Sequence, residues 1–182
     1  MKRKIVWHGG DGNGAEYCVL GSQPGGYRLE GTMVGSMEGA PLLVTYAVKA
    51  DINWVTRRVE IHVDGGGGKA SLILLADGYG SWWREKRQLH HLEGCLDVDL
   101  GCSPSTNTLA LRRLKLRQAQ TAEIAAAWVK VPELLVERSR QSYERLDANA
   151  YRFRSGSFEG DLIVDDDGLV VDYAAWTAAA KA

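Results

Sequence analysis

The chain has 182 residues, of which 45% are hydrophobic, and its 22 lysine and arginine residues nearly balance its 23 aspartate and glutamate residues. A chain of this length buries about 70% of the surface that its unfolded form exposes, so we expect a single domain, residues 1–182, with its own hydrophobic core. The net charge of -1 argues against the broad basic surface that drives nucleic-acid binding.

The start of the chain and its cysteines bear on the cellular compartment. Two lysines and an arginine lead to a three-residue apolar run and then to His8 and two glycines, which is too short a run for a signal peptide. Elsewhere no apolar run approaches the roughly 20 residues of a membrane helix. Three cysteines, an odd number, favour reduced thiols. We therefore expect a soluble, cytoplasmic protein without a membrane span, as a monomer or a dimer.

The composition predicts a mostly β fold. Twenty-one glycines and four prolines interrupt short runs rich in Val, Thr, Tyr and Trp, a pattern typical of antiparallel strands joined by turns. Helical periodicity is weak, and we expect residues 177–182 to form a frayed tail. In chain order, the predicted strands cover residues 4–7, 16–20, 27–34, 42–50, 54–63, 70–76, 81–88, 95–100, 122–131, 134–145, 150–154, 157–165 and 169–173. The segment 122–131 could also form one short helix, but Pro132 ends it and the alternation resumes beyond, which favours a strand.

Short sequence echoes connect the two halves of the chain. The Leu-Leu-Val segment at 42–44 recurs at 134–136, and the Asp-Gly pair at 77–78 recurs at 167–168. An internal duplication would produce such matches, and short alternating strands also produce them by chance. Duplication is therefore a hypothesis about the fold, not a requirement of it.

Arg57 stands out within the strand predicted over residues 54–63. Because successive side chains of a strand point to opposite faces, Arg57 falls in an apolar row with three valines and Ile61. A buried charge without a partner is costly, so Arg57 needs an acidic partner or a wet cavity. The alternative is that its long side chain extends to the rim of the sheet.

The densest group of chemically distinctive residues begins at Gly94. If residues 95–100 form a strand, Asp97 and Asp99 lie on one face, about 7 Å apart, and the intervening leucines and valine lie on the other. Two such carboxyl groups could share acid and base catalysis, contact a ligand, or form structural ion pairs with Arg57 or Arg112.

A polar run at 103–108, which includes Asn107, is composed of turn-forming residues. A regular strand after it would place Arg112 on the inward face with Leu114 and Leu116. Two inward arginines opposite the two aspartates would form a polar floor beneath an apolar cavity, an arrangement that suits an amphiphilic ligand. Tryptophans such as Trp54 and Trp82 could add flat surfaces for sugar rings or acyl chains.

Other kinds of site have weaker support. His90 and His91 are adjacent and cannot point the same way on a strand, and Cys95 and Cys102 lack the close spacing of a zinc knuckle, so we expect no metal. No phosphate-binding loop, dinucleotide fingerprint or nucleophile elbow is present, so we expect no cofactor. Two alternatives stay open: a hydrolase or lyase that uses Asp97 or Asp99 as general base, and a protein-interaction module.

Several spaced motifs resemble a bacterial family of formerly unknown function, described as "putative glycolipid-binding". The resemblance covers nearly the whole chain, with alanine at position 110 where the family motif has proline. The motifs that carry it are Asp51-x-x-Trp54-x-Thr56-Arg57, Asp77-Gly-x-Gly80-x-Trp82, Gly94-Cys-Leu-Asp-Val-Asp-Leu100, Pro104-x-Thr-Asn-Thr-Leu109 and Arg112-Arg-Leu114.

This resemblance implies a single antiparallel spiral β-roll or half-barrel, similar in shape to bacterial carriers of lipoproteins and glycolipids. It implies a partly apolar cavity for an amphiphilic small molecule such as a glycolipid. The residues expected to contact this ligand are Arg57, Arg112, Asp97, Asp99, Trp54, Trp82 and Asn107.

Overall fold

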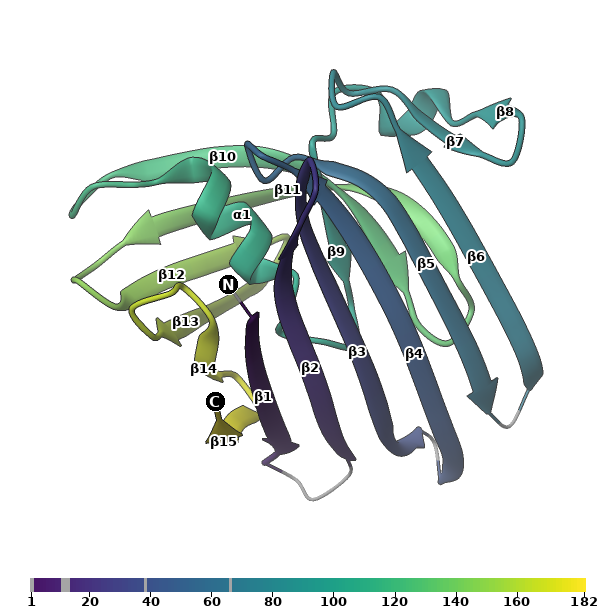
Figure 1. Ribbon diagram of the computed structural model, residues 1–182, viewed down its shortest axis with the longest axis horizontal. Helices are drawn as coiled ribbons and strands as arrows, with labels where there is room; N and C mark the ends of the chain where they lie inside the picture. Colours follow the sequence, from purple (N-terminus) through teal and green to yellow (C-terminus); the bar gives the residue numbers. More distant parts are fainter. Residues whose placement is uncertain (1, 11–13, 38, 66) are drawn as a thin grey trace.

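The protein is built on one 15-stranded sheet, which the computed structural model describes for residues 2–10, 14–37, 39–65 and 67–182 (Figure 1). The elements are β1 (Lys2–Gly9), β2 (Gly14–Gln23), β3 (Gly26–Met37), β4 (Ala40–Asp51), β5 (Thr56–Gly65), β6 (Gly68–Ala76), β7 (Trp82–Arg84), β8 (Arg87–Gln88), η1 (His90–Leu92), β9 (Asp97–Leu100), α1 (Asn107–Leu114), β10 (Thr121–Lys130), β11 (Leu135–Arg145), β12 (Ala150–Ser155), β13 (Phe158–Val164), β14 (Val170–Tyr173) and β15 (Trp176–Lys181).

The strand order is that of two meanders joined at the ends of the chain. One runs from β8 back to β1, the other from β15 back to β9, and β1 pairs with β15. The prediction of a frayed tail at residues 177–182 is wrong, because most of this segment is β15 and its backbone is paired with β1. The edge strands β8 and β9 are not paired with each other, so the sheet is not closed.

The prediction of a mostly β, largely antiparallel fold is confirmed. The pairing of β9 with β10 is parallel, whereas the other strand pairs are antiparallel. Strands alternate as the sequence predicts: Val98 and Leu100 pack into the main core, while Asp97 and Asp99 point to the other face. The main core lies between the first meander and the segment of β9 and β10 that covers it (Figure 1).

The prediction of a strand after the polar run is wrong, because this segment forms the helix α1. Ala110, Leu111 and Leu114 lie on one side of this helix, at the spacing of one and three residues that a helix brings together and that a strand would divide between its two faces. The helix lies against the second meander (Figure 1), where its buried side chains join Tyr143 and Phe153 in a second core. The interior of this half is therefore filled by the chain's own helix.

Three turns share one design, in which an aspartate carboxylate accepts hydrogen bonds from the backbone two and four residues later. They begin at Asp51, Asp77 and Asp165, with N–H to Oδ1 distances of 2.7–3.1 Å. The fourth residue of each turn has a positive φ. It is glycine at 80 and 168, the residue that adopts this conformation without strain, but it is tryptophan at 54, with φ 67°.

Candidate functional site

The residues expected to surround a single cavity are divided among different parts of the fold. Arg57 lies at the rim of the sheet. A register shift between β4 and β5 interrupts the alternation, so that buried Thr56 and Val59 are three residues apart and Arg57 leaves the apolar row. Its Nε is 3.4 Å from Asp51 Oδ2, and its guanidinium lies over Gly78. Arg57 therefore links the turn that begins at Asp51 to the turn that begins at Asp77.

Asp97 is fully engaged by an arginine, but not by Arg112. Arg113 donates two hydrogen bonds to the Asp97 carboxylate, at 2.9 and 2.6 Å. The helical course of the segment explains the difference, because consecutive residues of a helix point about 100° apart. Burial raises the pKa of Asp97, and the Arg113 hydrogen bonds oppose this effect.

Trp82 belongs to the core and not to a ligand surface. Its side chain is fully buried, and its indole N–H donates to the Cys95 carbonyl at 2.8 Å. Trp83 on the other face of β7 is half-buried, as the alternation predicts.

Asp99, by contrast, lines a pocket of about 410 Å³ at the N-terminal end of α1. The Gln141 side-chain amide donates to Asp99 Oδ2 at 2.6 Å, whereas Oδ1 has no donor among the described residues. Burial raises the Asp99 pKa to about 6, against the lowering effect of the Gln141 hydrogen bond. At pH 7 the pocket therefore contains a carboxylate that can accept a further hydrogen bond.

The walls of this pocket, which we call the Asp99 pocket, are mainly aromatic and small apolar residues. They come from β9, β10, β12, β13 and the segment that leads from β14 into β15. The aromatic residues that line it are Trp128, Phe153, Phe158, Tyr173 and Trp176.

Asn107 also lines the Asp99 pocket, from the first turn of α1. Its Oδ1 accepts a hydrogen bond from the Tyr143 hydroxyl at 2.7 Å, and its Nδ2 donates to the Pro104 carbonyl at 3.2 Å. These bonds fix the helix start against β11, so Asn107 positions the pocket wall.

A buried polar cluster lies directly behind this pocket, and the sequence analysis missed it. Ser103, which lines the pocket, donates to Glu16 Oε1 at 2.7 Å, and the Tyr46 hydroxyl donates to the same oxygen. Ser105 lies 2.8 Å from the Ser103 hydroxyl. Burial raises the Glu16 pKa to about 7, and Glu16 Oε2 has no hydrogen-bond partner among the described residues. The acid at position 16 in an otherwise apolar strand pattern was the available signal.

Arg112 and Trp54 lie together at the other end of α1, in a second pocket of about 560 Å³. The Arg112 guanidinium stands 4.8 Å from the centre of the Trp54 ring, and that ring stacks on Tyr27 with 3.6 Å between ring centres. Leu111 and Tyr151 contribute apolar wall. Arg112 and Trp54 do meet as expected, but in a different pocket from the one that Asp99 lines, and Asp97 pairs with Arg113.

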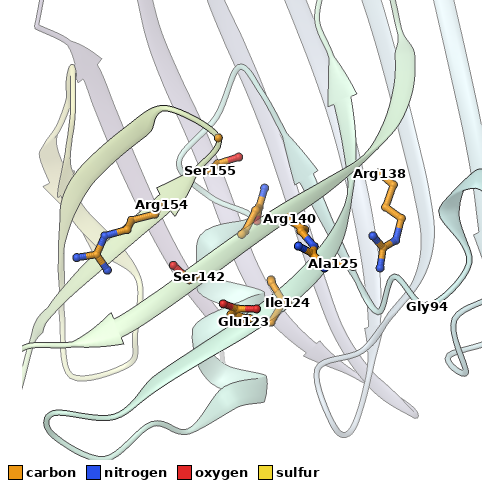
Figure 2. A pocket seen from close by; sticks show the side chains of 11 residues that line it. Gly94, Glu123, Ile124, Ala125, Arg138, Arg140, Ser142, Arg154 and Ser155 are labelled. Atoms are coloured by element: carbon orange, nitrogen blue, oxygen red, sulfur yellow. The ribbon is translucent and has the colours of Figure 1, made fainter.

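A third hollow, of about 460 Å³, lies on the opposite face of β10, β11 and β12 (Figure 2). Its charged lining residues are Arg138, Arg140, Arg154 and Glu123. Arg154 is paired with two glutamates, and the Arg138 Nε is 3.4 Å from a backbone carbonyl. This surface is charged and lacks aromatic residues, so it does not suit an amphiphile.

Within the described ranges, no cluster of three or more His, Cys, Asp or Glu side chains could hold a metal ion. In the same part of the chain, no helix has the length and apolar character needed to cross a membrane.

Comparison with known proteins places these features in a family. Residues 4–178 match the family described as "Putative glycolipid-binding". The chain is similar to a crystal structure of a DUF1089 family protein from Pseudomonas aeruginosa, with 37% identity, a TM-score of 0.80 and coverage of 87% of this chain and 89% of that one. A β-barrel-like protein of the DUF1849 domain of unknown function from Brucella abortus shares the fold, with 7% identity, a TM-score of 0.60 and coverage of 99% and 96%. No match was found among curated proteins.

Proposed function

Because the chain belongs to the family described as "Putative glycolipid-binding", we propose that it binds the sugar headgroup of an amphiphile in the Asp99 pocket. The observation that carries this proposal is the free Asp99 oxygen in a pocket whose walls are aromatic. A sugar ring has apolar C–H faces and hydroxyl edges. Trp128 and Trp176 supply surfaces for the faces, and Asp99 supplies an acceptor for the hydroxyls.

The apolar part of the ligand is assigned to the rim of the same pocket. Phe158 is 44% exposed and packs edge-on against Tyr173, which gives an apolar surface continuous with the pocket wall. An alkyl chain on this rim would gain about 25 cal/mol for each Å² removed from water. We place the ligand cavity beside α1 and not in the middle of the curved sheet, because the helix fills the interior of the second meander.

The two alternative functions, a hydrolase or lyase and a protein-interaction module, have less support. Asp97 is held by two hydrogen bonds from Arg113, so an acid and base pair of Asp97 and Asp99 is disfavoured. An interaction surface would be a large apolar patch, but the exposed Ile73 and Leu75 of β6 lie opposite Glu60 and Arg58 of β5, so charged side chains interrupt the apolar surface there.

Binding of octyl glucoside below its micellar concentration tests this proposal. We expect saturable binding by calorimetry, with Asp99→Asn weakening it by roughly tenfold, since a charge-assisted hydrogen bond becomes a neutral one. Affinity should also fall as the pH decreases through about 6, where Asp99 takes up a proton, and Asp99→Asn should remove this dependence.

Asp161→Asn is the matched control, because Asp161 is exposed and paired with Arg152 on the outer side of β13. It should bind octyl glucoside as the unaltered protein does. Equal weakening by both variants, or binding of octanol as tightly as octyl glucoside, would refute a sugar-specific site.

A further inference from the structure

We propose that the second pocket, between Trp54 and the C-terminal end of α1, is a separate binding site for a phosphate monoester. We call it the Trp54 pocket. It is distinct from the Asp99 pocket in position and in chemistry, because cations and not a carboxylate dominate its polar lining.

Two of the three cations of the Trp54 pocket are not used by the fold. Arg112 and Lys115 make no ion pair or side-chain hydrogen bond with any described residue, and the Arg112 guanidinium is held only over the Trp54 ring. Arg145 completes the set, and its donors go to backbone carbonyls at 2.7–3.1 Å. A guanidinium fork beside an ammonium group is suited to a tetrahedral dianion.

The negative charges nearby do not cancel this set. Asp165 accepts hydrogen bonds within its own turn and from Arg3, so its charge is already matched. Asp166 is exposed and is the one unpaired acid of the lining. The C-terminal end of α1 contributes about half a negative charge, which three cations outweigh.

The backbone of Trp54 supplies independent support. Its two sister turns have glycine at the equivalent position, and the positive φ is unfavourable for a bulky side chain. Strained residues of this kind concentrate where a side chain is needed for binding. With this backbone conformation the indole lies under Arg112 and against Tyr27, and the Arg112 side chain lines the pocket.

Titration with inorganic phosphate and with glycerol 3-phosphate, followed by calorimetry and by the Trp54 indole NMR signal, tests the site. We expect saturable binding that shifts the Trp54 signal, and a loss of affinity of roughly tenfold or more in Arg112→Gln. Lys115→Gly should also weaken binding while keeping the fold, because Lys115 has a positive φ of 49° that glycine adopts readily.

Arg140→Gln is the matched control, since Arg140 is exposed in the groove of Figure 2 and makes no ion pair among the described residues. It should bind both probes as the unaltered protein does. Vesicles containing phosphatidic acid form a parallel arm: binding of vesicles alone, lost in Arg112→Gln, assigns the phosphate to a lipid headgroup, and binding of glycerol 3-phosphate assigns it to a free metabolite.

The proposal is overturned if neither the soluble phosphates nor the vesicles bind, or if Arg112→Gln binds as Arg140→Gln does. Because octyl glucoside has no charge and its site has no residue in common with this one, failure here leaves the sugar-binding proposal unaffected.

Discussion

Burial of the Glu16 carboxyl group has a free-energy cost of desolvation that the sequence pattern does not reveal. It lies in β2 on the same face as the core residues Cys18 and Leu20, and its carboxyl group reaches the hydroxyls of Tyr46 and Ser103. Gly31 makes this arrangement possible, because a Cβ at that position would collide with the Tyr46 ring. Burial dominates over these hydrogen bonds, so the folded protein holds the Glu16 proton to a higher pH than the unfolded chain does.

The elevated Glu16 pKa predicts a loss of stability as the pH rises. The folded state binds the proton more tightly than the unfolded state, so the favourable contribution is complete below pH 4.5 and is lost as the pH rises through about 7. Over this range the free energy of unfolding should fall by roughly 3 kcal/mol, following the size of the shift. Glu16→Gln should remove most of that fall, as measured by urea unfolding between pH 4.5 and 8.

The same unfolding series on Asp99→Asn separates the effect of Glu16 from that of Asp99, because the Asp99 contribution disappears by about pH 6. A wild-type unfolding free energy that stays level from pH 5 to 8, or that rises, contradicts the account of Glu16.

At the scale of elements, the contact between α1 and β9 depends on one of two adjacent arginines. Arg113 pairs with the buried Asp97, whereas Arg112 lies over Trp54 and makes no ion pair with a described acid. The two side chains are matched in type and neighbours in sequence, so they separate the effect of the ion pair from that of a charged helix end.

Arg113→Met should reduce the free energy of unfolding by about 3 kcal/mol or more at pH 7, because it leaves the Asp97 carboxylate buried without its partner. Arg112→Met should cost about 1 kcal/mol or less, the usual size of a cation–π contact. Chemical denaturation of both variants measures the difference, and equal losses would show that the Asp97 ion pair does not hold the helix in place.

How much of these elements the sequence could predict depended on local regularity. Strands with clear alternation, such as β4, were predicted close to their observed bounds. Arg57 was misplaced because a bulge between β4 and β5 depends on the partner strand and not on the local pattern. Helix α1 was missed because eight residues give little periodicity, and most of its stability comes from packing against the second meander.

For the whole molecule, the sequence predicted the class of sheet but not its closure pattern. The pairing of β1 with β15 joins segments from opposite ends of the chain, and nothing in the alanine-rich end of the sequence identifies that partner. The echo at residues 77–78 and 167–168 is out of register in the structure by two residues, because the turn that begins at Asp77 is equivalent to the turn that begins at Asp165. Internal duplication stays a prediction.

The sequence predicted residues of the candidate site but not their arrangement, because the arrangement depends on contacts between distant segments. The polar residues were identified individually, and Asp99 and Asn107 do line one pocket while Trp54 and Arg112 line another. Their division between two pockets follows from a helix that lies between them, which the assumption of a continuous roll excluded. We therefore expect a sugar headgroup to bind at the Asp99 end of this helix.

Two-dimensional NMR of the six tryptophan indoles during titration with octyl glucoside tests this claim most directly. The signals of Trp128 and Trp176, which line the Asp99 pocket, should move in a saturable way, and those of the fully buried Trp7 and Trp82 should stay in place. Movement of the Trp54 signal without Trp128 and Trp176, or no movement of any signal at saturating detergent, would contradict it.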